Sequence, residues 1–282
     1  MSNLDRITVE PLVRAALLED LGRGGDLTTD AIVPGEARAR ARLVARKPGI
    51  VAGLEAAFLA FRLLDDGVAC IPAAADGDAV AAGDSVAEIR GRARTILSGE
   101  RTALNFLCRL SGIATATRSL VDLLAGTGAR VSDTRKTTPG LRALEKYAVR
   151  CGGGDNHRFG LDDAVLVKDN HLAIAGSIHA AVTAVRARVG HTVKVEVEVD
   201  TLEQLREALD EPIDAVLLDN MTPEQLARAV QIIGGRVLAE VSGGVTPETI
   251  VSIARSGVNV VSSGWLTHSA PALDFGLDVM SS

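Results

Sequence analysis

Polar residues recur at one kind of position in the second half of the chain, at or directly after the end of a short apolar run. A lone polar residue there is ordinary loop chemistry, but six together indicate a site. Lysine and arginine bind anions, carboxylates hold Mg²⁺ or stabilise a developing positive charge, and Ser/Gly loops offer backbone N–H groups to phosphate. The six positions are Arg135-Lys136, Lys168-Asp169, Glu198, Asp219-Asn220, Ser242-Gly243-Gly244 and Ser263-Gly264.

The stretch at 133–160, DTRKTTPGLRALEKYAVRCGGGDNHRFG, gathers positive charge in a protein of net charge −6. Such a cluster suits an anionic ligand. Three of its cations are four residues apart and share one face of a predicted helix, which is either a ligand-facing or a solvated basic face. The others lie in Pro- and Gly-rich turns, which favours a binding role. The helix cations are Arg142, Lys146 and Arg150, and the turn residues are Arg135, Lys136, His157 and Arg158.

Two motifs near the C-terminus, SGG at 242–244 and SSG at 262–264, indicate a phosphate site. Each follows an apolar run and precedes a predicted helix, where backbone N–H groups can surround a phosphate. In α/β barrels the common phosphate site follows the last two strands. A sugar-phosphate ligand is therefore expected.

Three charged residues close neighbouring apolar runs. Lys168 needs either a ligand anion or a carboxylate partner, because a buried unpaired ammonium is costly. Glu198 and Asp219 could face one cavity as a pair. Such a pair can hold Mg²⁺, bind ribose hydroxyls or stabilise a sugar cation.

The elements that must position these residues follow from the pattern of apolar positions. We expect a helix at 9–21, then a Gly-rich turn that closes at Pro34-Gly35. Strands and hairpins are expected over 37–96, including a hairpin at 76–91 that resembles biotinyl carrier domains but has no lysine to modify. A long or broken helix at 98–126 links two domains. Six short β-branched runs that alternate with helices then predict parallel βα units, which fit a barrel.

Composition excludes several classes of protein. The chain has 282 residues, 47% of them apolar and 23% charged, which is typical of a globular protein. Its negative charge and few aromatic residues argue against nucleic-acid binding. We expect no membrane span, no signal peptide and a cytoplasmic location. Three widely spaced cysteines indicate neither disulfides nor a thiolate zinc site, and Cys151 is better explained as a small residue at a helix end than as a nucleophile.

The motifs closely resemble those of the quinolinate phosphoribosyltransferase (carboxylating nicotinate-nucleotide pyrophosphorylase) family. The matching segments are SGERTALNFLCRLSGIAT, the 133–160 stretch, LVKDNH, EVEVDTLEQL, LLDNM, SGG and GWLTHS. The resemblance implies an α/β protein with an N-terminal α/β sandwich domain at 1–112 and an open seven-stranded α/β barrel at 113–267, the type II phosphoribosyltransferase architecture. The C-terminal tail, 268–282, is expected to pack on the first domain.

The resemblance also implies an activity: phosphoribosyl transfer from phosphoribosyl pyrophosphate to quinolinate with decarboxylation, giving nicotinate mononucleotide for NAD biosynthesis. Mg²⁺ is the expected cofactor, with Glu198 and Asp219 as direct or water-mediated ligands. A homodimer with shared active sites is expected. Arg101, Arg135, His157 and Arg158 are expected to bind quinolinate, with Arg101 reaching the partner's site. The residues expected around phosphoribosyl pyrophosphate are Thr134, Lys136, Lys168, Glu198, Asp219, Ser242, Gly243, Gly244, Ser263, Gly264 and Trp265.

Within that set, Lys136, Lys168, Glu198 and Asp219 are expected to be catalytic. Trp265 departs from the family pattern, where a small residue is expected, and its backbone N–H could still serve the phosphate. Two alternatives stay open. One is the paralogue encoded near molybdate transporters, which has another substrate, and the other is a non-catalytic barrel that binds sugar phosphates.

Overall fold

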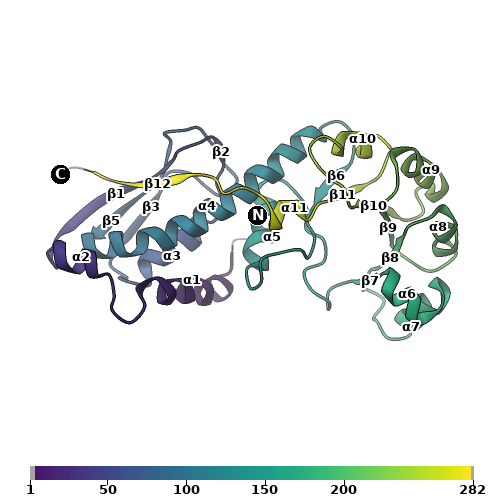
Figure 1. The fold of residues 1–282 in the computed structure, drawn as a ribbon, viewed down its shortest axis with the longest axis horizontal. Coiled ribbons are helices and arrows are strands. Elements are labelled where there is room, and N and C mark those ends of the chain that lie inside the picture. Colours follow the sequence, from purple (N-terminus) through teal and green to yellow (C-terminus); the bar gives the residue numbers. More distant parts are fainter. Residues whose placement is uncertain (1–3, 281–282) are drawn as a thin grey trace. The chain divides into compact units, whose positions relative to one another are not determined.

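A computed structural model describes residues 4–280 of the chain (Figure 1). It divides into two units. The first takes the described residues up to Arg118, together with Thr137–Gly153 and the residues from Leu266 onward. The second takes Ser119–Lys136 and Gly154–Trp265. We predicted a single domain boundary at 112/113. We did not predict that the helix within 137–153 belongs to the first unit.

The first unit combines an antiparallel sheet with helices. Its sheet has the strand order β12-β1-β5-β3, and β2 and β4 form a separate pair. The strands are β1 (Arg38–Ala45), β2 (Gly49–Ile50), β3 (Ala69–Pro72), β4 (Ala79–Val80), β5 (Ser85–Arg92) and β12 (Phe275–Val279). The helices are α1 (Arg6–Leu21), α2 (Leu27–Ile32), α3 (Leu54–Arg62), α4 (Ala93–Leu123, whose end lies in the second unit) and α5 (Arg142–Cys151).

Alternation along β1 explains which face of this sheet is buried. Arg40 and Arg42 are exposed, while Ala41 and Leu43 are fully buried, as the period of two in a strand requires. The C-terminal segment completes the sheet, because β12 runs antiparallel to β1. It also packs closely on α4, where a Cβ at Gly112 would collide with the Pro271 carbonyl oxygen.

The second unit is a parallel sheet with helices along its outer side (Figure 1). The strand order is β6-β11-β10-β9-β8-β7. The strands are β6 (Arg130–Ser132), β7 (Val165–Val167), β8 (Val195–Val199), β9 (Ala215–Asp219), β10 (Leu238–Ser242) and β11 (Val260–Ser262). The helices are α6 (Asp169–Ala175), α7 (Ile178–Arg186), α8 (Leu202–Leu209), α9 (Pro223–Ile233), α10 (Ile250–Ala254) and α11 (Trp265–His268, at the boundary).

Among the described residues this open sheet has six strands, one fewer than the seven that the family resemblance implied. All six predicted βα strands are present. At the seventh position Asp155 makes one isolated parallel bridge to Ser132, so that position is too short to count as a strand. Within residues 4–280 no pairing joins this edge to β7. The α/β class with a parallel barrel-type sheet is therefore confirmed.

Some predictions for single helices, turns and hairpins are confirmed, and others are wrong. The helix at 9–21 is confirmed as α1, and the linking helix is continuous as α4. The predicted turn before Pro34 is wrong in part, because it contains α2, which begins where the Asp26 side chain accepts a hydrogen bond from the Thr29 N–H. The hairpin at 76–91 is also wrong, since β4 pairs with β2 and β5 with β1 and β3.

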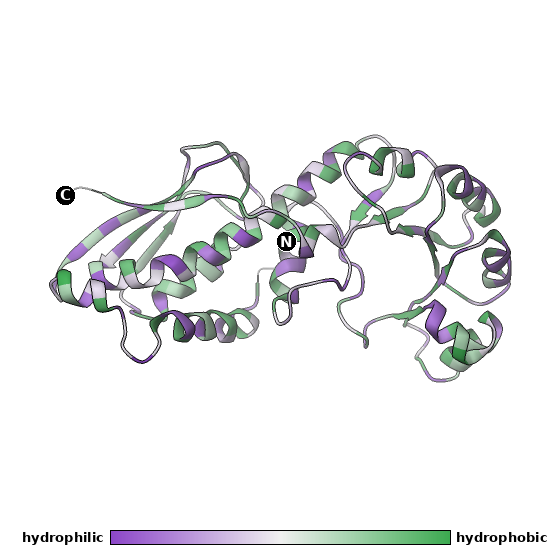
Figure 2. Cartoon of the chain, viewed as in Figure 1, coloured by the Kyte–Doolittle hydropathy of each residue, from purple (hydrophilic) through white to green (hydrophobic). Residues whose placement is uncertain are grey.

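Helices of both units carry hydrophobic residues on one side and hydrophilic residues on the other (Figure 2). The sides that face the sheets contribute to the core, for example Leu226 and Ile233 of α9. None of the helices described in the structure is both long and apolar enough to cross a bilayer.

Candidate active site

A cavity of about 370 Å³ lies at the carboxyl ends of the parallel strands in the second unit. Parallel strands bring the residues that follow them to one edge, so positions far apart in the sequence meet there. The lining comes from every strand of the sheet and its following loop. It consists of Thr134, Arg135, Lys136, His157, Arg158, Leu166, Lys168, Glu198, Leu217, Asp219, Glu240, Ser242, Gly243 and Ser262.

Two guanidinium groups lie close together in the cavity. The Nε atoms of Arg135 and Arg158 are both buried and have no hydrogen-bond partner among residues 4–280. Burial, followed by the charge of Arg135, lowers the pKa of Arg158. Two neighbouring cations with unused N–H groups are costly unless an anion with several oxygens binds between them.

A buried aspartate holds the loop that carries His157. The backbone N–H of His157 donates to Asp133 Oδ1 at 2.9 Å, and Asn156 Nδ2 donates to Asp133 Oδ2 at 2.7 Å. Asp133 itself is fully buried. This aspartate therefore fixes the loop of His157 and Arg158 to the end of β6, next to Arg135.

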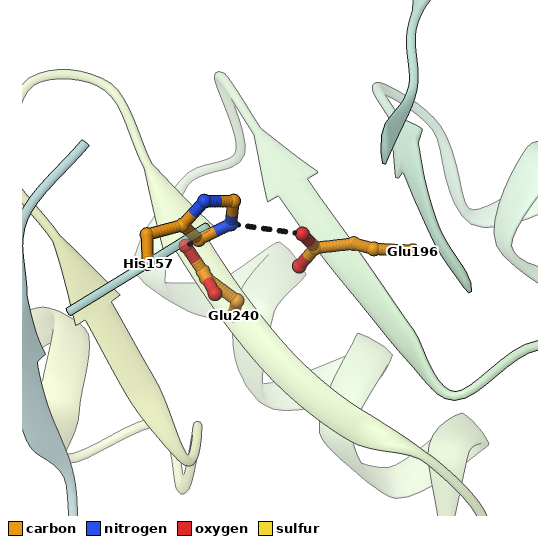
Figure 3. Close-up of side chains that lie close together, drawn as sticks. All are labelled: His157, Glu196 and Glu240. Atoms are coloured by element: carbon orange, nitrogen blue, oxygen red, sulfur yellow. Dashed lines mark hydrogen bonds and ion pairs between the residues drawn. The ribbon is translucent and has the colours of Figure 1, made fainter. Parts of the chain in front are cut away.

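The His157 ring faces two glutamates. Its Nε2 lies 2.9 Å from Glu196 Oε2 and 3.5 Å from Glu240 Oε1 (Figure 3). Ser262 donates a hydrogen bond to Glu240. Burial, and then the charge of Glu196, raises the pKa of Glu240, although His157 and Ser262 act in the other direction.

A second charged group lies around Lys168. Its Nζ is 2.9 Å from Glu198 Oε2, so this lysine has the carboxylate partner that the sequence left open. Burial, and then the charge of Asp200, raises the pKa of Asp219, and the positive charges of Lys168 and Lys136 oppose the rise. The cavity thus holds lysines and carboxylates close enough to act on one another.

The glycine loop after β10 leaves room at Asp219. Gly243 has φ +89°, and a Cβ there would lie 2.9 Å from Asp219 Oδ1. Any larger residue would push the carboxylate away and strain the backbone. Asn220 Nδ2 donates to the other oxygen, Asp219 Oδ2, at 2.8 Å, so both sides of this carboxylate are set by its neighbours.

Some expected residues lie elsewhere. Arg101 is on α4 in the first unit, where it is exposed. Ser263 is buried, and its N–H donates to the Ser132 carbonyl, which ties it to the sheet. Gly244, Gly264 and Trp265 are not among the residues that line the cavity. The helices after the two Gly loops are also short, five residues for α10 and four for α11.

Comparison with known proteins identifies the family. The model of the quinolinate phosphoribosyl transferase N-terminal domain matches residues 26–111, and that of the C-terminal domain matches residues 113–278. The chain belongs to the quinolinate phosphoribosyl transferase family. This confirms the resemblance inferred from its motifs.

Relatives and a solved structure are similar to this chain over nearly its whole length. The probable nicotinate-nucleotide pyrophosphorylase [carboxylating] of Bacillus subtilis (strain 168) is 45% identical over 276 residues, covering 98% of this chain and 95% of the relative. The Mycobacterium leprae nicotinate-nucleotide pyrophosphorylase [carboxylating] is 46% identical over 275 residues, covering 95% of each. The crystal structure of NadC from Streptococcus pyogenes has a TM-score of 0.95 at 42% identity and covers all of both chains.

Three residues of this quinolinate phosphoribosyl transferase site escaped the sequence analysis: Asp133, Glu196 and Glu240. Period-two alternation offered a signal for one of them. In VEVEV the glutamates alternate with buried valines, so Glu196 must share the face of Glu198. No local signal existed for the pairing of Glu240 with His157, which are 83 positions apart in the sequence.

The helix α5 carries the cations of the 133–160 stretch that do not line the cavity. Only 2% of Lys146 is exposed, so this lysine is not part of a solvated face, whereas Arg150 is exposed.

Burial raises the pKa of Cys151 to about 12, so its thiolate is disfavoured. This supports the interpretation of Cys151 as a small packing residue.

Proposed function

We propose that this protein transfers the phosphoribosyl group of phosphoribosyl pyrophosphate to the ring nitrogen of quinolinate and releases CO₂, pyrophosphate and nicotinate mononucleotide. One observation carries the proposal beyond family membership. The buried Nε–H groups of Arg135 and Arg158 have no partner among the described residues, and both arginines line the cavity together with His157, as binding of a dicarboxylate would require. The names of similar proteins, nicotinate-nucleotide pyrophosphorylase [carboxylating], agree with this chemistry.

Charge compensation explains how two polyanions could meet. Arg135, Arg158 and His157 would hold the quinolinate carboxylates, and Lys136 and Lys168, which line the same cavity, would lie between them and the sugar phosphate. The ring nitrogen then forms a bond to the anomeric carbon as the bond to pyrophosphate breaks. Glu198 and Asp219 would stabilise the positive charge that develops on the ribose.

Decarboxylation follows from the product of that transfer. The new pyridinium nitrogen withdraws the electron pair left at C2 when the adjacent carboxylate departs as CO₂, and C2 then takes up a proton. No separate electron-sink cofactor is required by this step. The residues of this chain contribute by binding and orienting the ring.

Mg²⁺ is the proposed cofactor, held by Glu198 and Asp219. Carboxylate oxygens are suitable ligands, and Mg²⁺ usually combines one or two of them with water and substrate phosphates. These two residues do not belong to a cluster of three metal-binding side chains among residues 4–280, so pyrophosphate and water would complete the coordination. When bound, the ion would neutralise the leaving pyrophosphate.

A homodimer with shared sites is part of the proposal. Arg101 is an exposed cation on α4, available to a neighbouring subunit. In a two-fold dimer each partner would offer the same residue to the other's site. We also propose the cytoplasm as the location, in keeping with three cysteines that form no disulfide.

The test is a product assay. Purified protein is incubated with quinolinate, phosphoribosyl pyrophosphate and Mg²⁺, and nicotinate mononucleotide is followed by mass spectrometry, with nicotinate as the parallel substrate. The Lys136→Ala variant, purified identically, controls for a host enzyme. Product is expected from quinolinate and not from nicotinate. Absence of product with both substrates would contradict the proposal and favour the transporter-linked paralogue or a binding barrel.

A further inference from the structure

The exposed face of the antiparallel sheet in the first unit carries positive charge. Exposed side chains at alternating positions of β1 and β5 supply it, and they are Arg38, Arg40, Arg42, Arg90 and Arg92. The residues between them turn to the other, buried or partly buried face, as the period of two in a strand requires. We call these five arginines the arginine face. They do not line the cavity of the second unit and have no role in the proposed reaction.

Arginines lie opposite arginines across the two strands. The antiparallel register pairs Arg38 with Arg92 and Arg40 with Arg90. Directly opposite side chains share a face and have Cβ atoms about 4.5–5.5 Å apart, so like charges at such positions destabilise a sheet. Two of these pairs in succession oppose folding, and a requirement of the fold therefore does not account for them.

Two carboxylates neutralise part of this charge. Glu88 Oε1 accepts hydrogen bonds from Arg40 Nε at 2.6 Å and from Arg90 Nε at 2.8 Å, so two guanidiniums share one carboxylate. Asp65 Oδ2 lies 3.7 Å from Arg92 Nε. Five arginines against these two carboxylates leave an excess of three positive charges, on a chain whose formal net charge is −6.

Two members of the arginine face have no carboxylate partner among the described residues. Within 4–280, Arg38 and Arg42 form neither an ion pair nor a side-chain hydrogen bond. The residues opposite Arg42, Asp278 on β12 and Glu88 on β5, pair with other arginines instead, Asp278 with Arg46. Two exposed guanidiniums are therefore available on one strand, four residues apart.

We propose that the arginine face is a docking surface for a short acidic segment of another protein, bound in an extended conformation with carboxylates at alternate positions. Alternate residues of β1 are about 6.6–6.8 Å apart, which is the repeat that an extended peptide presents on one of its own faces. A guanidinium fork binds a carboxylate through two parallel hydrogen bonds. Carboxylates four residues apart in the segment then reach Arg38 and Arg42, and the excess positive charge is neutralised.

A nucleic acid is the rival polyanion, and the face suits it less. The strands β1, β3 and β5 contain no aromatic residue on which a base could stack, and Phe275 of β12 is buried. A nucleic acid has a charge at every nucleotide, so a phosphate would meet Glu88, whereas a peptide can place an uncharged residue there. Ile71, which lies opposite Glu88 and is 41% exposed, offers that residue an apolar contact.

Peptide binding tests the proposal directly. The probe is a labelled peptide of alternating glutamate and serine, followed by fluorescence anisotropy at low ionic strength, where exposed charges are least screened. The double variant Arg38→Gln/Arg42→Gln loses two exposed ion pairs with the peptide, so Kd should rise about threefold to thirtyfold. The matched variant Arg23→Gln/Arg228→Gln removes two exposed arginines elsewhere and should change Kd less than about twofold.

The cationic cavity is unchanged in both variants, so peptide binding there cannot produce a difference between them. Equal weakening in the two variants, or no binding of the peptide to the parent protein, would overturn the proposal.

Thermal unfolding separates docking from a structural role. Arg38→Gln removes the repulsion with Arg92, so its Tm should equal or exceed that of the parent while peptide binding weakens. A lower Tm would assign this arginine to the fold and overturn the proposal.

Two further measurements report other occupants of the face. Polyuridylate replaces the peptide in the anisotropy assay, and tighter binding of polyuridylate that Arg38→Gln/Arg42→Gln abolishes would overturn the proposal in favour of a nucleic acid. Sedimentation velocity compares parent and double variant at low and high salt. The same oligomeric state in both is expected, and self-association that the double variant loses would overturn the proposal in favour of a second copy of this chain.

Discussion

Lys136 and Glu198 lie in the same cavity but supply opposite charges. Lys136→Ala and Glu198→Ala should each reduce turnover by about 10²–10³-fold, the usual effect of losing one preorganised electrostatic group. The measurement is kcat for nicotinate mononucleotide formation. A matched Glu224→Gln change on α9 should retain activity, and rates within about threefold of the parent in both site variants would contradict these roles.

Glu240 gives a pH-dependent stability. Burial, followed by the charge of Glu196, raises its pKa above that of an unfolded chain. The folded state therefore binds an extra proton, so this contribution is present below the unfolded pKa and is lost as pH rises through the folded value. In thermal unfolding between pH 5 and pH 8, the Tm of Glu240→Gln should gain on that of the parent as pH increases. A constant difference would contradict the assignment.

At the scale of elements, Asp214 joins β8 to the loop before β9. Burial raises its pKa, but hydrogen bonds from Lys194, the Val195 N–H and Arg186 outweigh burial and lower it to about 2. The stabilisation is therefore present above the unfolded pKa of about 3.9 and is lost as pH falls toward the folded value. Asp214→Asn should cost about 1–3 kcal/mol at pH 7 by urea unfolding. The deficit should shrink from pH 4 toward pH 2, and a pH-independent deficit would contradict this.

An ion pair with a fully buried carboxylate connects α4 with α5 inside the first unit. Arg109 Nη2 lies 2.8 Å from Oε1 of Glu145, which is fully buried and also accepts from the Thr138 N–H and hydroxyl. Glu145→Ala leaves the guanidinium without its carboxylate and should cost about 3 kcal/mol in urea unfolding. Arg14→Ala removes an exposed pair on α1 and should cost less than about 0.5 kcal/mol. Equal effects would contradict the importance of burial.

At the scale of the whole molecule, the shared-site proposal predicts complementation. Arg101→Ala and Lys136→Ala subunits are each expected to be inactive alone. In a re-equilibrated equal mixture half of the dimers are mixed, and each has one intact site, so about a quarter of the parent activity should return. The product assay measures it, with each variant alone as control. No recovery would contradict a site built from two subunits.

Sequence patterns predicted the parts of the fold that depend on local order. The six βα strands and the cavity residues at their ends follow from alternation and chain direction alone. Pairings between segments that are far apart in the sequence produce no local pattern of this kind. The attachment of α5 to the first unit depends on Arg109 and Glu145, and Glu240 lies beside a loop residue, His157, that is distant in the sequence. A mid-strand glutamate looks the same in sequence whether it meets solvent or a histidine.

The pairing of β12 with β1 has a consequence for biosynthesis. The first strand of this sheet, β1, is translated long before its neighbour, Phe275–Val279. The segments of the second unit are all synthesised before that strand. The barrel-type sheet can therefore assemble during translation, whereas one edge of β1 stays unpaired, and open to pairing with other chains, until β12 has been translated.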